Sequence, residues 1–300
     1  MPAYFVKIIP VLIMFCLGFI SKKLKVFTSK DADRFLQLVL NVTLPALTIV
    51  SLTNLKLDLN LLYLILFPLA IVLITFIPAN YITNKLKVST KTKGSFLIGS
   101  LIINTGFVST FIYAFYGEAA FGYYSLFDLG NSFMIYIFAY FQAIRFSCKG
   151  KSQLPLLKML SLPPLWGIGI GLIINMLSLE LNPLMLETLN YIGMPTMPLM
   201  IFSLGIYFQP RIANFKLTLG VLSLRMLLGF GLGMLIVELF KLEQPISDIV
   251  ILCSAAPVGF NTLIFSELEE LDKEFAATIV SFSILISLIF IFGYSCFRLG

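Results

Sequence analysis

Two apolar stretches of this sequence are interrupted by residues that disfavour a helix, and amide side chains lie at both interruptions. Proline removes a backbone donor and clashes with the preceding turn, and glycine loosens the turn. In hydrocarbon, such a break persists only where it is buried in protein or lines a watery cavity. Two half-helix N-termini meeting there would offer free amides and positive dipole ends to an anion. The candidate anion-binding residues are Asn104, Thr105, Gly106, Pro257, Gly259 and Asn261.

A structural alternative exists for both breaks. A proline kink can pack on a neighbouring helix while asparagines form hydrogen bonds between helices. Pro257 alone does not separate the two interpretations. The corresponding break at 104–106 favours the binding site, although that stretch contains no proline.

Two charged residues lie within apolar stretches, and each is a candidate for function. A charge at the membrane midplane costs about 2.5–3.5 kcal/mol on insertion scales. Arg225 is the candidate for binding a substrate carboxylate, and Asp128 is the candidate proton carrier. Asn131 lies one helical turn after Asp128, on the same face. The alternatives are a static bridge between Arg225 and Asp128, and sodium coupling through side-chain oxygens and freed carbonyls.

Composition places the chain in a membrane. Of its 300 residues, 59% are hydrophobic and only 12% are charged, against about 25% charged in a soluble domain. Apolar runs of about 20 residues, the length that crosses a bilayer, recur throughout. The chain has no histidine and its four cysteines share no CxxC spacing, so we expect no metal site and no cofactor. No basic, aromatic-interleaved face predicts nucleic-acid binding.

The hydropathy pattern predicts ten transmembrane helices. Most of the 21 Lys and Arg residues fall in odd-numbered loops, whereas the even-numbered loops contain only Lys56 and Lys241. By the positive-inside rule, the odd loops are cytoplasmic and both termini lie outside. The predicted spans are 3–21, 35–53, 60–81, 95–113, 120–145, 156–177, 185–208, 214–237, 246–266 and 274–297.

The spans divide into two halves, 1–150 and 151–300. "NVTLPAL" in the second span corresponds to "NYIGMPT" in the seventh, and Gly106-Phe107 corresponds to Gly259-Phe260, all at an offset near half the chain. Because each half holds five spans, the second half is inverted relative to the first. Inverted repeats are typical of secondary transporters.

Five further motifs resemble the auxin efflux carrier family of bacteria and plants, which includes plant PIN-type carriers and bacterial malonate or malate carriers. They are "NVTLPAL", "FDLGNSF", "MPLMIFSLGIYF", "RMLLGFGLG" and "AAPVGFNTLIFSELEELDKEFAATIVSFSILIS". The last is the most specific, and the resemblance covers essentially the whole chain. The sequence departs from the family in the fourth span, where relatives often carry a proline and this chain has Gly106.

The resemblance implies an all-α membrane protein with ten transmembrane helices in a 5+5 inverted repeat, similar to bile-acid symporters and sodium/proton antiporters. Helices 1, 2, 6 and 7 would form a scaffold domain. Helices 3–5 and 8–10 would form a transport domain, in which the broken helices 4 and 9 cross. Carried over by motif, Asn104, Pro257 and Asn261 fall at the crossing and Arg225 at a basic position. The family also implies elevator-type carriage of organic anions and a homodimer.

These observations together predict a secondary transporter, not an enzyme, in the plasma membrane. Its expected substrate is a small organic anion, a mono- or dicarboxylate bound at the crossing. Coupling to H⁺ or to Na⁺ is left open by the sequence. A membrane sensor that binds its ligand without transport is the alternative, although the chain contains no long cytoplasmic segment for signalling.

Overall fold

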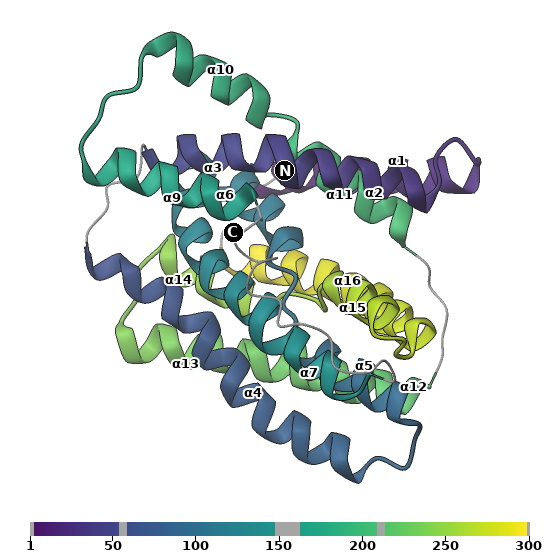
Figure 1. The fold of residues 1–300 in the computed structure, drawn as a ribbon. Coiled ribbons are helices and arrows are strands. Elements are labelled where there is room, and N and C mark those ends of the chain that lie inside the picture. Colours follow the sequence, from purple (N-terminus) through teal and green to yellow (C-terminus); the bar gives the residue numbers. More distant parts are fainter. Residues whose placement is uncertain (1–2, 54–58, 148–162, 209–213, 299–300) are drawn as a thin grey trace.

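The computed structural model describes residues 3–53, 59–147, 163–208 and 214–298 (Figure 1). The described residues are almost entirely helical. Lys56 and the start of the predicted sixth span, 156–162, lie outside them. Five helical stretches are long and apolar enough to cross a membrane: Ser29–Thr53, Leu61–Lys85, Pro183–Tyr207, Phe215–Phe240 and Lys273–Arg298.

The described residues of the first half form seven α-helices, of which two are extended by a π-helical turn and one is preceded by a 3-10 turn. They are α1 (Ala3–Lys23), α2 (Ser29–Leu38), η1 (Val39–Thr43), α3 (Leu44–Thr53), η2 (Leu59–Ile65), α4 (Leu66–Lys85), α5 (Thr90–Leu101), α6 (Thr105–Phe133), η3 (Met134–Ala139) and α7 (Tyr140–Arg145).

The second half continues in the same manner. Its elements are α9 (Pro163–Met176), α10 (Pro183–Gly193), α11 (Thr196–Tyr207), α12 (Phe215–Leu222), η4 (Ser223–Leu227), α13 (Leu228–Phe240), α14 (Ile246–Ser254), α15 (Asn261–Leu268) and α16 (Lys273–Arg298). The element η4 is a π-helical turn that joins α12 to α13.

The element α6 consists of two helical segments that fold back on each other. Gly117 has φ 77° and ψ −166°, which lies outside the helical region. Glycine occupies this left-handed region without the steric cost that a Cβ would add. The reversal brings Asp128 back to within 2.5 Å of Thr105, measured between the carboxylate and the hydroxyl. This local turn therefore positions a carboxylate beside the beginning of α6.

The helices form two groups (Figure 1). In one group α1 packs along α11 and α3 along α9, with α2 and α10 beside them. Gly18 and Gly205 make the α1–α11 approach close, because a Cβ on either would meet a backbone carbonyl of the other helix. The other group contains α4, α5, α7 and α12–α16, and α6 contacts both groups.

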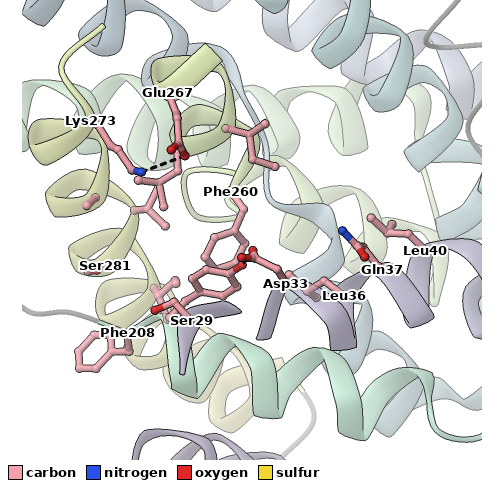
Figure 2. A pocket seen from close by; sticks show the side chains of 16 residues that line it. Ser29, Asp33, Leu36, Gln37, Leu40, Phe208, Phe260, Glu267, Lys273 and Ser281 are labelled. Atoms are coloured by element: carbon pink, nitrogen blue, oxygen red, sulfur yellow. Dashed lines mark hydrogen bonds and ion pairs between the residues drawn. The ribbon is translucent and has the colours of Figure 1, made fainter. Parts of the chain in front are cut away.

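A cavity of about 590 Å³ lies between the two groups. One wall comes from α2 and α11 and the other from α15 and α16, as Figure 2 shows. Three residues in or beside predicted odd-numbered loops line it: Ser29 in the first loop, Phe208 directly before the seventh and Lys273 in the ninth. Phe260, the residue before α15, also lines it. The cavity therefore reaches from the odd-loop side towards the interruption between α14 and α15.

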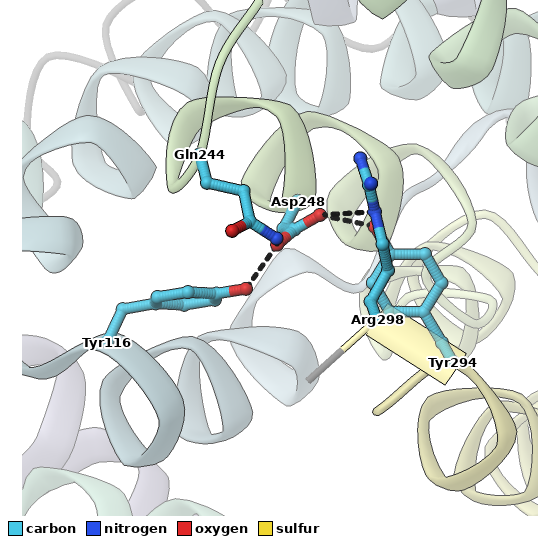
Figure 3. A network of polar contacts seen from close by, with 5 residues as sticks. All are labelled: Tyr116, Gln244, Asp248, Tyr294 and Arg298. Carbon is cyan, nitrogen blue, oxygen red and sulfur yellow. Dashed lines mark hydrogen bonds and ion pairs between the residues drawn. The ribbon is translucent and has the colours of Figure 1, made fainter. Parts of the chain in front are cut away.

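A buried carboxylate ties together three elements at the opposite end of the second group (Figure 3). The side chain of Asp248, in the first turn of α14, is fully buried. It accepts hydrogen bonds from the hydroxyls of Tyr116 and Tyr294 and from Gln244 Nε2, the last at 2.8 Å. Arg298 Nε lies 3.4 Å away. These donors compensate the burial of the charge, which would otherwise be costly.

Gly259→Ala should destabilise the protein by about 1–3 kcal/mol, because overpacking a tight contact forces the neighbours to shift. The new Cβ would lie 2.5 Å from Ile102 Cγ2. Gly231→Ala is the matched control, because a Cβ there meets nothing within 4 Å. Thermal unfolding in detergent measures both. Equal unfolding temperatures for the two variants would contradict a close approach at Gly259.

Tyr116→Phe should cost about 1–3 kcal/mol, the usual effect of removing a hydrogen bond to a buried charged group. The loss leaves the Asp248 carboxylate one donor short. Tyr123→Phe is the control, because the described residues offer the Tyr123 hydroxyl no hydrogen bond. Chemical unfolding in detergent would compare them, and an effect of the control as large as that of Tyr116→Phe would count against the cluster.

Candidate functional site

Two interrupted helices meet in the second group. The first interruption separates α5 from α6 at residues 102–104, and the second separates α14 from α15 at residues 255–260. The helix in the first half is thus broken even though it has no proline. Ile103 and Val258 form an isolated antiparallel bridge, so the two non-helical segments run side by side.

Backbone hydrogen bonds hold the crossing together. The Asn104 N–H donates to the Pro257 carbonyl at 2.9 Å, and the Gly259 N–H donates to the Ile102 carbonyl at 2.9 Å. The Val258 N–H donates to Ser283 Oγ at 3.0 Å. An unpaired backbone group in an apolar interior is costly, so each interruption satisfies groups that the other frees. Pro257 therefore stabilises the crossing through its backbone carbonyl, and Gly259 does so through its backbone N–H.

Asn104 is the cap of α6. Its Oδ1 accepts from the Phe107 N–H at 3.1 Å. The first N–H groups of a helix have no acceptor within it, so those of Thr105 and Gly106 remain available. Asn104 is only 9% exposed, and its Nδ2 has no hydrogen-bond partner among the described residues. The beginning of α6 therefore holds a buried donor group with unused capacity.

Asp128, Thr105 and Asn131 form one network at the same end of α6. The Thr105 hydroxyl donates to Asp128 Oδ1 at 2.5 Å. Asn131 Nδ2 lies 3.2 Å from Asp128 Oδ1, 3.0 Å from Thr105 Oγ1 and 3.4 Å from the Ile103 carbonyl. The structure thus brings both residues predicted to take part in coupling to the crossing itself.

Arg225 lies at the carbonyl end of a helix, α14, whereas Asp128 lies at the amide end of α6. Arg225 is fully buried in η4, and its guanidinium donates to the carbonyls of Ser254 and Ala256, the second at 3.4 Å. These carbonyls end α14, where the helix dipole is negative. Nη1 of Arg225 has no hydrogen-bond partner in the described part of the chain. Between the described residues no ion pair joins Arg225 to Asp128, and Asp128 makes its hydrogen bonds to Thr105 and Asn131 instead.

Asn261 is the first residue of α15 and is partly exposed. Its side chain lies beside that of Tyr136 in η3. The adjacent Phe260 faces the cavity of Figure 2. Asn261 therefore lies between the crossing and the cavity, and not within the Asn104–Asp128 network.

The cavity itself carries few charges. Glu267 and Lys273 form an ion pair at 2.9 Å, and Asp33 accepts a hydrogen bond from Tyr207 on the opposite wall. Most of the other lining side chains are apolar. The described residues contain no group of three or more Cys, Asp or Glu side chains that could hold a metal ion.

The sequence does not predict the roles of two residues that form these polar contacts, Ser283 and Asp248. Ser283 lies in the last apolar helix and accepts a hydrogen bond from the Val258 N–H. The only signal in the sequence is that a polar residue stands at the depth of the interruption. The sequence pattern also does not single out Asp248, because a carboxylate near the end of a span resembles an ordinary interfacial residue. Asp248 lies near the start of the predicted span 246–266, and its complete burial depends on tyrosines far away in the chain.

Comparison with known proteins agrees with this architecture. A family model described as "Membrane transport protein" matches residues 3–295. The uncharacterized transporter MJ1031 of Methanocaldococcus jannaschii is 24% identical over 291 residues, which cover 94% of either chain. With several helices able to cross a membrane, the protein is a multi-pass membrane protein of a family of transporters. The chain belongs to the membrane transport protein family, the auxin efflux carrier family that its motifs resemble.

Proposed function

We propose that this protein is a secondary transporter of a small organic anion, a mono- or dicarboxylate, bound where α5–α6 cross α14–α15. One observation carries the proposal: the buried Asn104 Nδ2, at the positive end of α6, has no hydrogen-bond partner among the residues that the structure describes. Helix N-termini attract anions through free N–H groups and the helix dipole. A carboxylate there would accept from Asn104 Nδ2 and from the amides of Thr105 and Gly106.

Asn261 and Arg225 contribute to the same site in different ways. Asn261 stands at the start of α15, directly after Phe260, which lines the cavity. Arg225 holds the carbonyl end of α14 in place, and its Nη1, for which the described segments offer no partner, adds positive potential to the crossing. Gly259 lets the two segments approach closely, and Pro257 supplies the carbonyl that receives the Asn104 N–H.

The cavity of Figure 2 is the proposed substrate path on the cytoplasmic side. It opens beside the odd-numbered loops, which the positive-inside rule places in the cytoplasm of a protein in the plasma membrane, with both termini outside. Its walls belong to different helix groups. We interpret the group around α1, α3, α9 and α11 as the scaffold and the other as the transport domain. Elevator-type movement between them would close this path and open the opposite one.

The reciprocal pairing of the two interruptions supports the 5+5 inverted repeat that this mechanism uses. The Asn104 N–H donates to the Pro257 carbonyl and the Gly259 N–H donates to the Ile102 carbonyl, on either side of the Ile103–Val258 bridge. The two interruptions occupy corresponding places in the two halves. The family resemblance adds a homodimer of such ten-helix units as the working assembly.

Flux through liposomes tests the proposed function. Organic acids are first screened for thermal stabilisation of the purified protein, with pyruvate and malate as the starting mono- and dicarboxylate. Uptake of each labelled acid into proteoliposomes should be saturable and should exceed that of protein-free vesicles. Stabilisation by an acid that is never transported would indicate a sensor, and neither effect with any acid would refute the anion site.

Asn104→Asp separates binding from helix capping. Aspartate is as good a cap as asparagine, so α6 should still form, although a second carboxylate beside Asp128 should lower the thermal stability at neutral pH. The variant replaces the free Nδ2 donor by a negative oxygen at the proposed carboxylate position. We expect carboxylate affinity to fall at least about tenfold, as the loss of a hydrogen bond to a charged group implies.

The control for this variant is Asn182→Asp. Asn182 caps α10 in the same manner, with its Oδ1 accepting from the Leu184 N–H at 2.9 Å, but it lies far from the crossing on an exposed helix. Uptake by this control should equal that of the wild type. Unchanged affinity in Asn104→Asp would remove Asn104 Nδ2 from the binding site.

A further inference from the structure

The positive end of α6 already has an anionic side chain beside it. Asp128 Oδ1 accepts from the hydroxyl of Thr105, the first residue of that helix, at 2.5 Å. The substrate carboxylate of the proposed function would bind to the amides of the same first turn. Two carboxylates at one helix end repel each other strongly in a poorly solvated interior. One of them is therefore expected to be neutral when both are present.

Among the residues that the structure describes, no cation pairs with Asp128. The titratable side chains that face it are Tyr124 on its own element, Tyr136 in η3 and Cys253 in α14. All three are neutral or can become negative. Arg225, the buried cation of the crossing, contacts the carbonyls of Ser254 and Ala256 and not Asp128. A second negative charge at this position would thus meet no compensating cation in the described part of the chain.

The oxygens around Asp128 are arranged for a proton rather than for a metal cation. A hard cation would need Asp128, Thr105 and the Ile103 carbonyl together as ligands. The Asn131 amide nitrogen lies among these three oxygens, at 3.0–3.4 Å from each, and so occupies the position that the cation would take. A proton needs only the carboxylate, which can bind it without displacing Asn131.

We propose that this transporter carries one proton with each substrate carboxylate, and that Asp128 is the proton-binding residue. The inference rests on the proposed function. Without substrate, Asp128 is an anion that accepts from Thr105. When the carboxylate binds, a proton from water in the cavity forms an O–H bond to Asp128, and it dissociates to water on the opposite side after the substrate leaves. No other covalent change occurs.

The coupling between proton uptake and substrate binding determines whether carboxylate affinity rises or falls with pH. Since substrate binding takes up one proton, carboxylate affinity should fall about tenfold per pH unit above the pH at which Asp128 ionises, and should level off below it. Pyruvate is a suitable probe because its own carboxyl group stays ionised through the neutral range. Because the charge of pyruvate does not change in this range, a change in its affinity with pH reports protonation of the protein and not of the substrate.

Proteoliposomes that contain the proton indicator pyranine provide the test. Labelled pyruvate or malate added outside should enter together with protons, and an inward proton gradient should drive accumulation of the label. Replacing sodium by potassium should have no effect. Asp128→Asn should still exchange labelled carboxylate down its gradient, but without proton entry and with a flat pH dependence of affinity. Glu269→Gln, which neutralises another buried carboxylate away from the crossing, should keep proton entry.

The outcomes separate this inference from the function on which it rests. Carboxylate uptake by the wild type without proton entry, or with a strict sodium requirement, would overturn proton coupling and leave the anion transporter intact. Proton entry that persists with carboxylate in Asp128→Asn would move the proton site elsewhere. If Asp128→Asn does not fold, the wild-type ratio of protons to pyruvate decides alone. No carboxylate flux in the wild type would remove both proposals.

Discussion

The fold depends on how two broken helices satisfy their backbone groups within a membrane. Lipid offers neither donors nor acceptors, so an interruption in one helix is stable only if protein groups replace the lost hydrogen bonds. Here the interruption at 102–104 and the one at 255–260 pair with each other through the Ile103–Val258 bridge and its two hydrogen bonds. Each break is the partner of the other, and the close approach at Gly259 follows from this pairing.

The two intramembrane charges follow from the same crossing. A broken helix exposes a negative carbonyl end and a positive amide end. Arg225 lies at the carbonyl end of α14, and Asp128 lies at the amide end of α6. The charges are held apart by helix ends of opposite sign, instead of forming the static bridge that was one alternative. This separation leaves the beginning of α6 with an anion that can be neutralised, beside the unused donor of Asn104.

Much of this arrangement can be predicted from the sequence, because its signals are local. Pro257 and Gly259 mark the second interruption, and an amide, a threonine and a glycine mark the first. The partners of the charges are not local: the carbonyls bound by Arg225 lie 29 and 31 residues further along the chain. The surroundings of Asp248 were missed for the same reason, because Tyr116 and Tyr294 converge on it only in the folded chain. The first helix breaks without proline because the second segment pairs with it.

The central claim is that a carboxylate binds at the beginning of α6, within the crossing. An experimental structure of the protein with a bound organic acid tests it most directly. The account predicts density for the carboxylate within hydrogen-bond distance of Asn104 Nδ2 and the amides of Thr105 and Gly106, with the remainder of the molecule directed towards Phe260. Density for the acid only at another place, with Asn104 Nδ2 still unoccupied, would contradict it.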